Sequence, residues 1–261
     1  MPSALLDRLE RYYDQVPRSA ARVETLGPFT LFVKQGGGFP YYARPSLGAP
    51  TFTTQDVDRV RERQRQLDIP ESFEWVAETT PDLAAAIEAS GLSVHRHPLL
   101  VLERPLPVGG VEGITVRLLS ADDQNLARVS AVGKLAFGSP GTALGDVGIE
   151  ALQSAMPDSV EFQRERLRSG RMVTAAAFTR AGDPVALGSH QPVDAVSEIV
   201  GVGTLPAYRR RGIGAALTAL LIEDALRRVE TVFLSAGDDD VARMYERVGF
   251  RRVATACIAE P

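Results

Sequence analysis

The most constraining feature of the sequence is the segment 199–217, in which an apolar stretch leads through a basic turn into a helix that begins at glycine. Three consecutive arginines, 209–211, precede Gly212 and Gly214. The first turn of a helix presents backbone N–H groups and the positive end of the helix dipole, which together attract anions. Glycine has no Cβ, so a ligand can approach the backbone closely. The segment predicts a site for a pyrophosphate-like group.

The wider context of this turn resembles the GNAT superfamily of acetyl-CoA-dependent N-acetyltransferases. The shared pattern is Arg-x-x-Gly-x-Gly, formed here by Arg209, Gly212 and Gly214, with a second matching segment at 238–250. In that family the loop holds the pyrophosphate of coenzyme A. The resemblance implies acetyl-CoA as the cosubstrate, no metal, and these coenzyme-binding residues: Val202, Gly203, Thr204, Arg209, Arg210, Arg211, Gly212, Ile213, Gly214 and Ala215. Val202, Gly203 and Thr204 would pair with the pantetheine amides as an added strand would.

Two side chains match catalytic positions of the family. Glu198 precedes Gly212 by 14 residues, where histone acetyltransferases of this superfamily carry a general-base glutamate. Glu198 would take the amine proton directly or through water; otherwise it is a solvated carboxylate at a strand edge. Tyr245 lies just before Gly249 and Phe250, where a family tyrosine points its hydroxyl at the coenzyme sulfur. It would act as the general acid, although its helical face is apolar and also suits a core position.

The sequence departs from the family at Asp238. Family members often carry asparagine seven residues before this tyrosine, in contact with the pantetheine arm. Asp238 is followed here by Asp239 and Asp240. Asp238 takes the coenzyme-binding position in the pattern, but a carboxylate near an anionic coenzyme is unfavourable, and these acids could instead cap a helix.

The chain contains an internal repeat. Residues 232–260 repeat the strand–helix–strand order of residues 73–104, with Gly249 aligned on Gly91. A cluster of proline and glycine at 104–110 predicts a linker.

The predicted fold class is α/β, with tandem GNAT-like domains that each contain a mixed, mostly antiparallel sheet flanked by helices. We expect a degenerate N-terminal domain over 1–108 and the acetyltransferase domain over 109–261. This two-domain plan is similar to that of mycothiol synthase.

The first domain lacks the phosphate-binding pattern. Its corresponding helix is expected to begin near Thr53, with Asp56 and Asp58 in place of glycine. The glycine run 36–38 precedes aromatic residues and predicts a hairpin turn, since a phosphate loop would be followed by a helix with Lys-Ser/Thr.

Local patterns also predict where some helices begin. Ser120 is expected to cap a helix, and Asp158 with Glu161 to form a capping box for the next helix. His190 is expected in a loop at a strand end, near the substrate cleft.

Composition narrows the class of protein. A net charge of −4 without a basic tract argues against nucleic acid as a partner. The lone Cys257 excludes an internal disulfide and favours a reducing, cytoplasmic location. No stretch reaches the length of a membrane span, and the N-terminal helical pattern carries acids, unlike a signal peptide. His95 and His97 share a strand face but lack further metal ligands at usable spacing.

The residues favour transfer of an acetyl group from acetyl-CoA to an amine by direct attack in the second domain. The acceptor would be a small-molecule or peptide amine, in contact with 138–157 and the first domain. The alternative is a non-catalytic acyl-CoA-binding or sensing module that keeps the loop without turnover. The sequence specifies neither the acceptor nor the oligomeric state.

Overall fold

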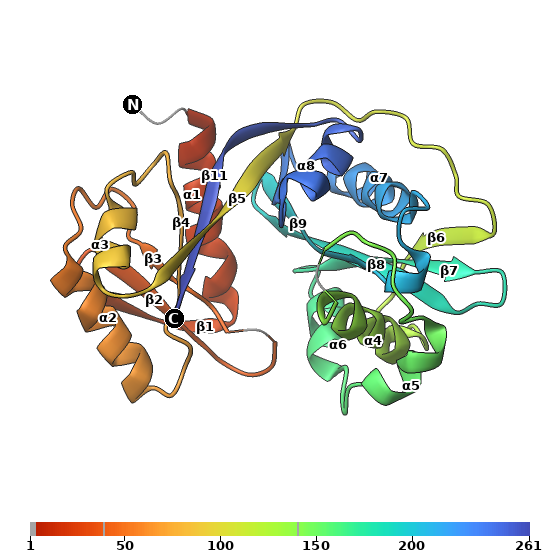
Figure 1. The fold of residues 1–261 in the computed structure, drawn as a ribbon, viewed down its shortest axis with the longest axis horizontal. Coiled ribbons are helices and arrows are strands. Elements are labelled where there is room, and N and C mark those ends of the chain that lie inside the picture. The colour runs from red at the N-terminus through yellow and green to blue at the C-terminus, as the bar shows by residue number, and fades with distance from the viewer. Residues whose placement is uncertain (1–3, 39, 140) are drawn as a thin grey trace. The chain divides into compact units, whose positions relative to one another are not determined.

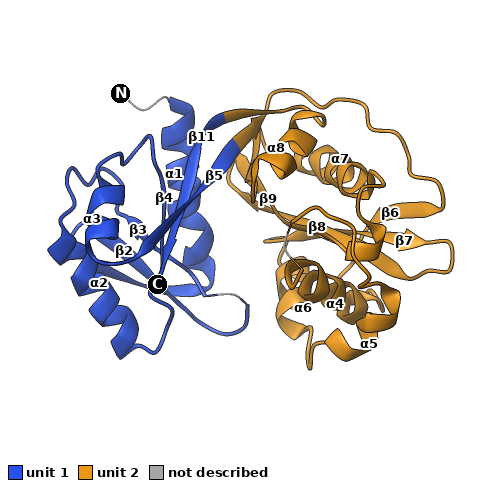
Figure 2. Ribbon diagram, in the orientation of Figure 1, with its two compact units in different colours: residues 1–99, 253–261 blue, residues 100–252 orange. Residues whose placement is uncertain are grey.

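The computed structural model describes residues 4–38, 40–139 and 141–261. The chain forms two compact units: residues 1–99 with 253–261, and residues 100–252 (Figure 2). The expected boundary between 108 and 109 lies inside the second of these units, and the C-terminal segment 253–261 belongs to the first. Within the described residues, no helix combines the length and apolar character that crossing a membrane requires.

The first unit contains a sheet flanked by helices (Figure 1). Its elements are α1 (Ala4–Gln15), η1 (Val16–Ser19), β1 (Ala21–Leu26), β2 (Phe29–Lys34), β3 (Ala43–Pro45), α2 (Thr54–Gln66), β4 (Phe73–Val76), α3 (Leu83–Ala89), most of β5 (Ser93–Leu102) and most of β11 (Phe250–Glu260). The strand order is β1-β2-β3-β4-β11-β5. β3 and β4 run parallel, whereas the pairs β1–β2, β2–β3 and β4–β11 are antiparallel.

Alternation along β2 separates the two faces of this sheet. Phe29 packs with Val57 and Val60 of α2 and with Ile87 of α3 in one apolar cluster. The opposite face carries Arg44 of β3, which ion-pairs with Glu10 of α1 at 3.2 Å and with Glu74 of β4 at 2.6 Å. The first unit therefore has its own core.

The second unit contains β6 (Ile114–Leu118), α4 (Leu126–Phe137), η2 (Ile149–Ala151), α5 (Leu152–Ala155), α6 (Glu161–Arg168), β7 (Val173–Thr179), β8 (Pro184–Val193), β9 (Val196–Thr204), η3 (Pro206–Tyr208), α7 (Ile213–Ala225), β10 (Thr231–Ser235) and α8 (Asp239–Glu246). Its strands follow the order β5-β10-β9-β8-β7-β6. The pairs from β6 to β9 are antiparallel, and β9 runs parallel to β10.

The second sheet is also covered on both faces. On one face, a Cβ added at Gly188 of β8 would lie 2.6 Å from Cδ2 of Leu217 in α7. The other face places Ala176 and Phe178 of β7 in a cluster with Val129 of α4, against which Leu167 of α6 packs. The predicted α/β class with mostly antiparallel sheets is confirmed.

Two strands are exchanged between the repeated strand–helix–strand segments. β11 follows β10 and α8 in sequence, yet it pairs with β4 of the first repeat, with Ala256 opposite Val76. β5 follows β4 and α3, yet it neighbours β10 of the second repeat. Both strands pass from one unit into the other, as the change of colour along each shows (Figure 2).

The expected linker at 104–110 is hydrogen-bonded to the turn before β11. The amide of Glu103 donates to the carbonyl of Gly249 at 3.0 Å, and that of Leu106 to the carbonyl of Val248 at 3.1 Å. These bonds fix the segment within the second unit.

Three local predictions are wrong. α4 begins at Leu126 with Asn125 at its N-cap, because Ser120 lies in the preceding turn. α6 has Val160 at its N-cap and no side-chain capping bond, so Asp158 and Glu161 do not form a capping box. His190 lies inside β8 and is fully buried.

Candidate active site

The strands β9 and β10 pair over a short stretch. Val196–Glu198 lie opposite Thr231–Phe233, and no further β9–β10 pair is found among the described residues. β9 continues to Thr204, and Gly201, at φ 63°, lies at the register shift against β8. The β10-facing edge of 199–204 is therefore open to an extended ligand that carries amide groups, as an added strand would be.

The basic turn after β9 ends at a helix N-terminus. Gly212 is the N-cap of α7 at φ 81°, a conformation that glycine adopts readily. The amide of Ala216 makes the first intrahelical bond, to the carbonyl of Gly212 at 3.1 Å. The amides of Ile213, Gly214 and Ala215 have no intrahelical acceptor. α7 thus presents the donor set and dipole that suit a phosphate group.

Arg209 has a structural task in this turn. Its guanidinium donates to the carbonyl oxygens of Thr204 (3.2 Å), Ala136 (3.0 Å), Ser139 (2.5 Å) and Ala143 (3.2 Å). Burial lowers the pKa of Arg209 below its usual value. These bonds fix the segment after α4 to the end of β9, so the side chain of Arg209 organises the turn.

The two following arginines are exposed. The guanidinium of Arg211 lies 5.5 Å from the ring of Tyr208, and Arg210 adopts φ 60°. Their charges remain at the surface next to the start of α7.

Glu198 lies where β9 and β10 separate. It is the last β9 residue paired with β10, opposite Phe233, and it pairs with Gln191 of β8 on its other side. Its side chain is half-buried. Glu198 therefore occupies the fork between the separating strands.

Tyr245 lies on α8, and its ring is buried edge-on against Phe250 at 5.9 Å between centroids. Burial raises the pKa of its phenol, so the hydroxyl keeps its proton. A Cβ added at Gly214 would lie 3.9 Å from Cε of Met244 and 4.0 Å from Oγ1 of Thr204. α8, the start of α7 and the end of β9 therefore converge around the open edge.

Asp238 caps α8. Its carboxylate accepts the amide of Val241 at 2.8 Å. The neighbouring Asp239 pairs with Arg252 at 2.6 Å. The structure thus gives Asp238 the helix-capping role that the sequence left as the alternative.

A buried polar network, which the sequence analysis missed, crosses the second unit. Nδ1 of His190 lies 2.8 Å from Oγ of Ser197, and its Nε2 lies 3.0 Å from Asp224 of α7. All three are buried, and this serine–histidine–aspartate set links β8, β9 and α7.

In the first unit, a side-chain capping box occupies the helix N-terminus that corresponds to the phosphate loop. The carboxylate of Asp56 accepts the amide of Thr53 at 3.1 Å and its hydroxyl at 2.6 Å, while the Thr53 hydroxyl accepts the amide of Asp56 at 3.2 Å. This capping box places a carboxylate where an anion would bind. The expected helix start near Thr53 is confirmed, since α2 has Thr53 at its N-cap.

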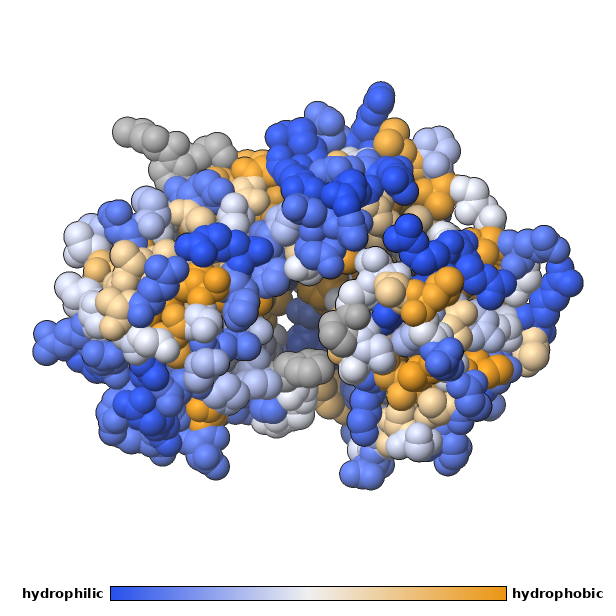
Figure 3. All heavy atoms as spheres, in the orientation of Figure 1, coloured by the Kyte–Doolittle hydropathy of each residue, from blue (hydrophilic) through white to orange (hydrophobic). Residues whose placement is uncertain are grey.

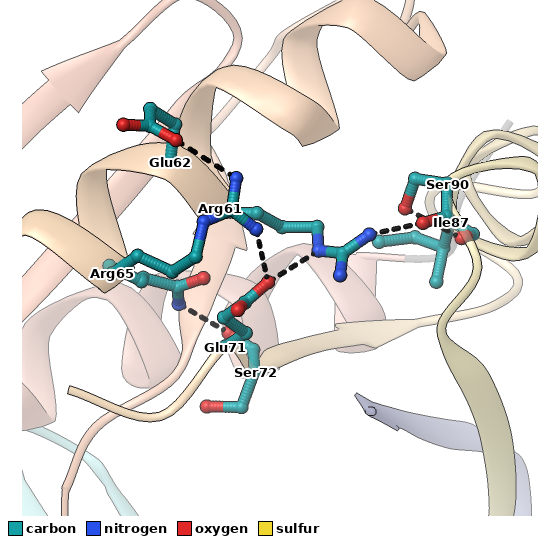
Figure 4. Close-up of polar contacts among 8 residues, drawn as sticks. Arg61, Glu62, Arg65, Glu71, Ser72, Ile87 and Ser90 are labelled. Atoms are coloured by element: carbon teal, nitrogen blue, oxygen red, sulfur yellow. Dashed lines mark hydrogen bonds and ion pairs between the residues drawn. The ribbon is translucent and has the colours of Figure 1, made fainter. Parts of the chain in front are cut away.

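Further bonds hold α2 in place (Figure 4). Arg61 and Arg65 share Glu71 at 2.7 and 3.0 Å, and Arg61 also donates to the carbonyl of Ser90 after α3. Gln64 donates to the carbonyl of Ser72 at 2.9 Å. Among the described residues, no group of three or more His, Cys, Asp and Glu side chains could hold a metal ion.

Comparison with known proteins agrees with this geometry. Residues 147–250 match the family model "Acetyltransferase (GNAT) family". Comparison with curated proteins finds no match.

Solved structures share the fold over nearly the whole chain. A GCN5-related N-acetyltransferase from Kribbella flavida is 24% identical, with 100% of this chain and 97% of that chain covered at a TM-score of 0.74. One from Sphaerobacter thermophilus is 18% identical, with 98% and 84% covered at 0.63. A tandem GNAT protein from the clavulanic acid biosynthesis pathway is 17% identical, with 89% and 78% covered at 0.58.

The separated β9–β10 pair and the glycine-opened α7, together with these solved structures, define the class of protein as one with a GNAT-type α/β fold. More particularly, residues 147–250 match the model of the GNAT acetyltransferase family, which confirms the resemblance seen in the sequence.

Proposed function

We propose that this protein is an N-acetyltransferase that moves an acetyl group from acetyl-CoA to a primary amine in its second unit. The observation that carries the proposal is the position of Glu198 at the fork between β9 and β10, where the open edge of β9 leads to the uncapped start of α7. A pyrophosphate at α7 and a pantetheine arm along β9 would bring the thioester toward this fork.

Each residue has a defined task. When bound, acetyl-CoA supplies an activated acetyl thioester. Glu198 removes a proton from the acceptor amine, so that the nitrogen attacks with a lone pair. Backbone N–H groups of 199–204 polarise the thioester carbonyl as negative charge develops on its oxygen. Tyr245 donates its proton to the departing sulfur as the C–N bond forms and the C–S bond breaks; its raised pKa keeps this proton in place beforehand.

The test is Glu198→Gln, which keeps the side-chain shape and removes the base. We expect turnover to fall by about 10²-fold or more at neutral pH, while the affinity for coenzyme A stays unchanged. Raising the pH should restore part of the rate, because more of the amine is then already neutral. Thiol release with a panel of amines measures turnover, and calorimetry measures coenzyme affinity.

Glu223→Gln is the matched control, because that carboxylate is exposed on α7 and pairs with Arg227 at the surface. It should behave as wild type. An equal deficit for Glu198→Gln at every pH would mean that Glu198 orients the acceptor without taking its proton. Coenzyme binding without thiol release from any amine would favour the acyl-CoA-binding module instead.

A further inference from the structure

A polar surface interrupts the face of the second sheet that α4 and α6 cover. Further along this face lie apolar residues such as Ala176 and Phe178. The polar surface, here called the polar floor, consists of four residues from three adjacent strands: Thr174, Ser189, Gln191 and Glu198. A sheet face beneath helices is normally apolar, because it forms the core. Polar residues here indicate a role other than packing.

The strand register places these side chains in direct contact range. Thr174 lies opposite Ser189, with 2.8 Å between their hydroxyl oxygens. Gln191 lies opposite Glu198. Side chains directly opposite on antiparallel strands have Cβ atoms roughly 5 Å apart. Ser189 and Gln191 lie two residues apart on the same face of β8, so the pair Gln191–Glu198 is next to the pair Thr174–Ser189.

Arg166 of α6 faces this floor. Its Nη2 donates to Oε1 of Gln191 at 3.0 Å, and the residue is only 9% exposed. Its Nε is buried without a hydrogen-bond partner. Among the described residues, no carboxylate forms an ion pair with this guanidinium, and its other neighbour is the ring of Phe162 at 5.8 Å.

An arginine that is buried without an ion-pair partner can still bind an anion. The guanidinium has five N–H donors in a planar fork that matches a carboxylate. A buried charge without a counter-charge and a buried donor without an acceptor both destabilise a fold. Such a group is retained at a cost in stability unless it binds something of opposite charge.

We propose that the acceptor is an amino acid whose carboxylate binds Arg166 while its amine faces Glu198. Gln191 is bonded to Arg166 and lies opposite Glu198 in the β8–β9 ladder, so the cation and the proposed base both neighbour this one residue. That arrangement suits an amine and a carboxylate within one small molecule. A protein N-terminus, which has an amide in place of the carboxylate, would lack the charge. This proposal rests on the proposed function and specifies its substrate class.

The first experiment needs no variant. Thiol release from acetyl-CoA is measured for wild type with free amino acids and with the corresponding amino acid amides, and kcat/KM is calculated from the concentration of neutral amine in each case. We expect kcat/KM to favour the carboxylates by at least about tenfold, which corresponds to one charge-assisted pair. Equal use of the amides, or a preference for them, would overturn the proposal while leaving the acetyltransferase function standing.

The second experiment changes the arginine. Arg166→Gln should bring the two kcat/KM values together, mainly through KM for the carboxylates, and Arg166→Lys should keep part of the preference. Exposed Arg168, on the same helix, provides the control Arg168→Gln, which should keep the full preference. If Arg166→Gln retains the wild-type preference, the carboxylate is bound elsewhere and the proposal fails.

A third readout is independent of turnover. Free amino acids should raise the melting temperature of wild type, and their amides should not. Arg166→Gln should abolish this effect and should melt no lower than wild type, because it removes an uncompensated buried charge. A marked loss of stability in Arg166→Gln, together with no response of wild type to amino acids, would show that Arg166 serves the fold through Gln191 and would overturn the proposal.

Discussion

At the scale of single residues, Tyr245 combines a packing role with the proposed acid role, and one substitution separates them. Tyr245→Phe keeps the ring that packs against Phe250 and removes only the hydroxyl. The melting temperature should change little, whereas turnover should fall about tenfold or more. The reason is that an ordinary thiolate, with a pKa of about 8.5, would then leave without a proton.

Steady-state rates and thermal melting check this expectation, and Tyr208→Phe is the control. Tyr208 lies in the same unit beneath Arg211, and its hydroxyl has no role in the proposed proton transfer. Wild-type turnover in Tyr245→Phe would show that Tyr245 is a core residue alone.

The basic turn shows which parts of a site a sequence can reveal. The need for glycine at position 212 is readable, because its φ of 81° favours a residue without Cβ. The task of Arg209 is not readable, because its acceptors at Ala136 and Ser139 lie 73 and 70 residues earlier in the chain. No sequence pattern indicated that Arg166 is buried, because burial of a residue on a short polar helix depends on tertiary packing.

At the scale of elements, the turn between α8 and β11 has almost no room for a side chain. A Cβ added at Gly249, where φ is 111°, would lie 1.8 Å from the carbonyl oxygen of Arg104. Gly249→Ala would therefore displace the 103–106 segment that is bonded to this turn. We expect a loss of unfolding free energy of about 4 kcal/mol or more, in the range of the most damaging substitutions.

Gly91→Ala is the matched control from the first repeat. Gly91 has a φ of 86°, yet a Cβ there would meet nothing within 4 Å. Only the left-handed backbone conformation is unfavourable for alanine there, so the unfolding free energy should fall by about 1–2 kcal/mol. Urea unfolding of both variants measures the difference, and similar losses would contradict a steric role for Gly249.

The buried network of His190, which joins β8, β9 and α7, makes the stability of the fold depend on pH. Burial lowers the pKa of His190, although Asp224 partly opposes this shift. As pH falls through about 6.5, the unfolded histidine takes up a proton before the folded one does. Stability is therefore full above about pH 6.5 and is lost progressively as pH falls from there toward the lowered folded pKa.

A neutral substitute should remove this dependence. Urea unfolding of His190→Gln and of wild type between pH 7.5 and 5 should show a smaller loss on acidification for the variant. The carboxylates shared by both proteins cancel in this difference. His95→Gln, at an exposed position, should lose as much stability on acidification as wild type does. Parallel pH profiles for His190→Gln and wild type would show that His190 titrates alike in both states.

Most elements could be predicted from the sequence, but not all of their partners. The strand after α8 was predicted from the strand–helix–strand repeat over 232–260, and β11 occupies Phe250–Glu260. Its pairing with β4 was not predicted, because strand periodicity carries no information on which of two repeated partners a strand joins. The same limit applies to helix starts: Ser120 has the right residue type, but α4 begins at Leu126, after a turn in which Arg117 binds Asp123.

At the scale of the whole molecule, the two units have opposite chemistry at corresponding helix starts. Gly212 leaves the first amides of α7 without side-chain caps, whereas the carboxylate of Asp56 closes α2 through its capping box with Thr53. Asp56 also bonds Arg59 at 3.3 Å. A pyrophosphate at α2 would have to displace this carboxylate and would be repelled by it, so the start of α2 suits an anion less well than the start of α7 does.

We therefore predict one coenzyme A per chain, bound in the second unit, and titration calorimetry gives this number directly. Gly212→Asp should abolish binding, because the new carboxylate would occupy the pyrophosphate position. Its φ of 81° costs the variant about 1–2 kcal/mol, but the fold should survive, since a Cβ at this position meets only Val111 Cγ2, at 3.8 Å. Gly214→Ala, with contacts at 3.9 and 4.0 Å, tests whether bulk alone matters and should fold normally. Asp56→Asn should leave both affinity and stoichiometry unchanged. A stoichiometry near two, or wild-type affinity in Gly212→Asp, would place the coenzyme elsewhere than at α7.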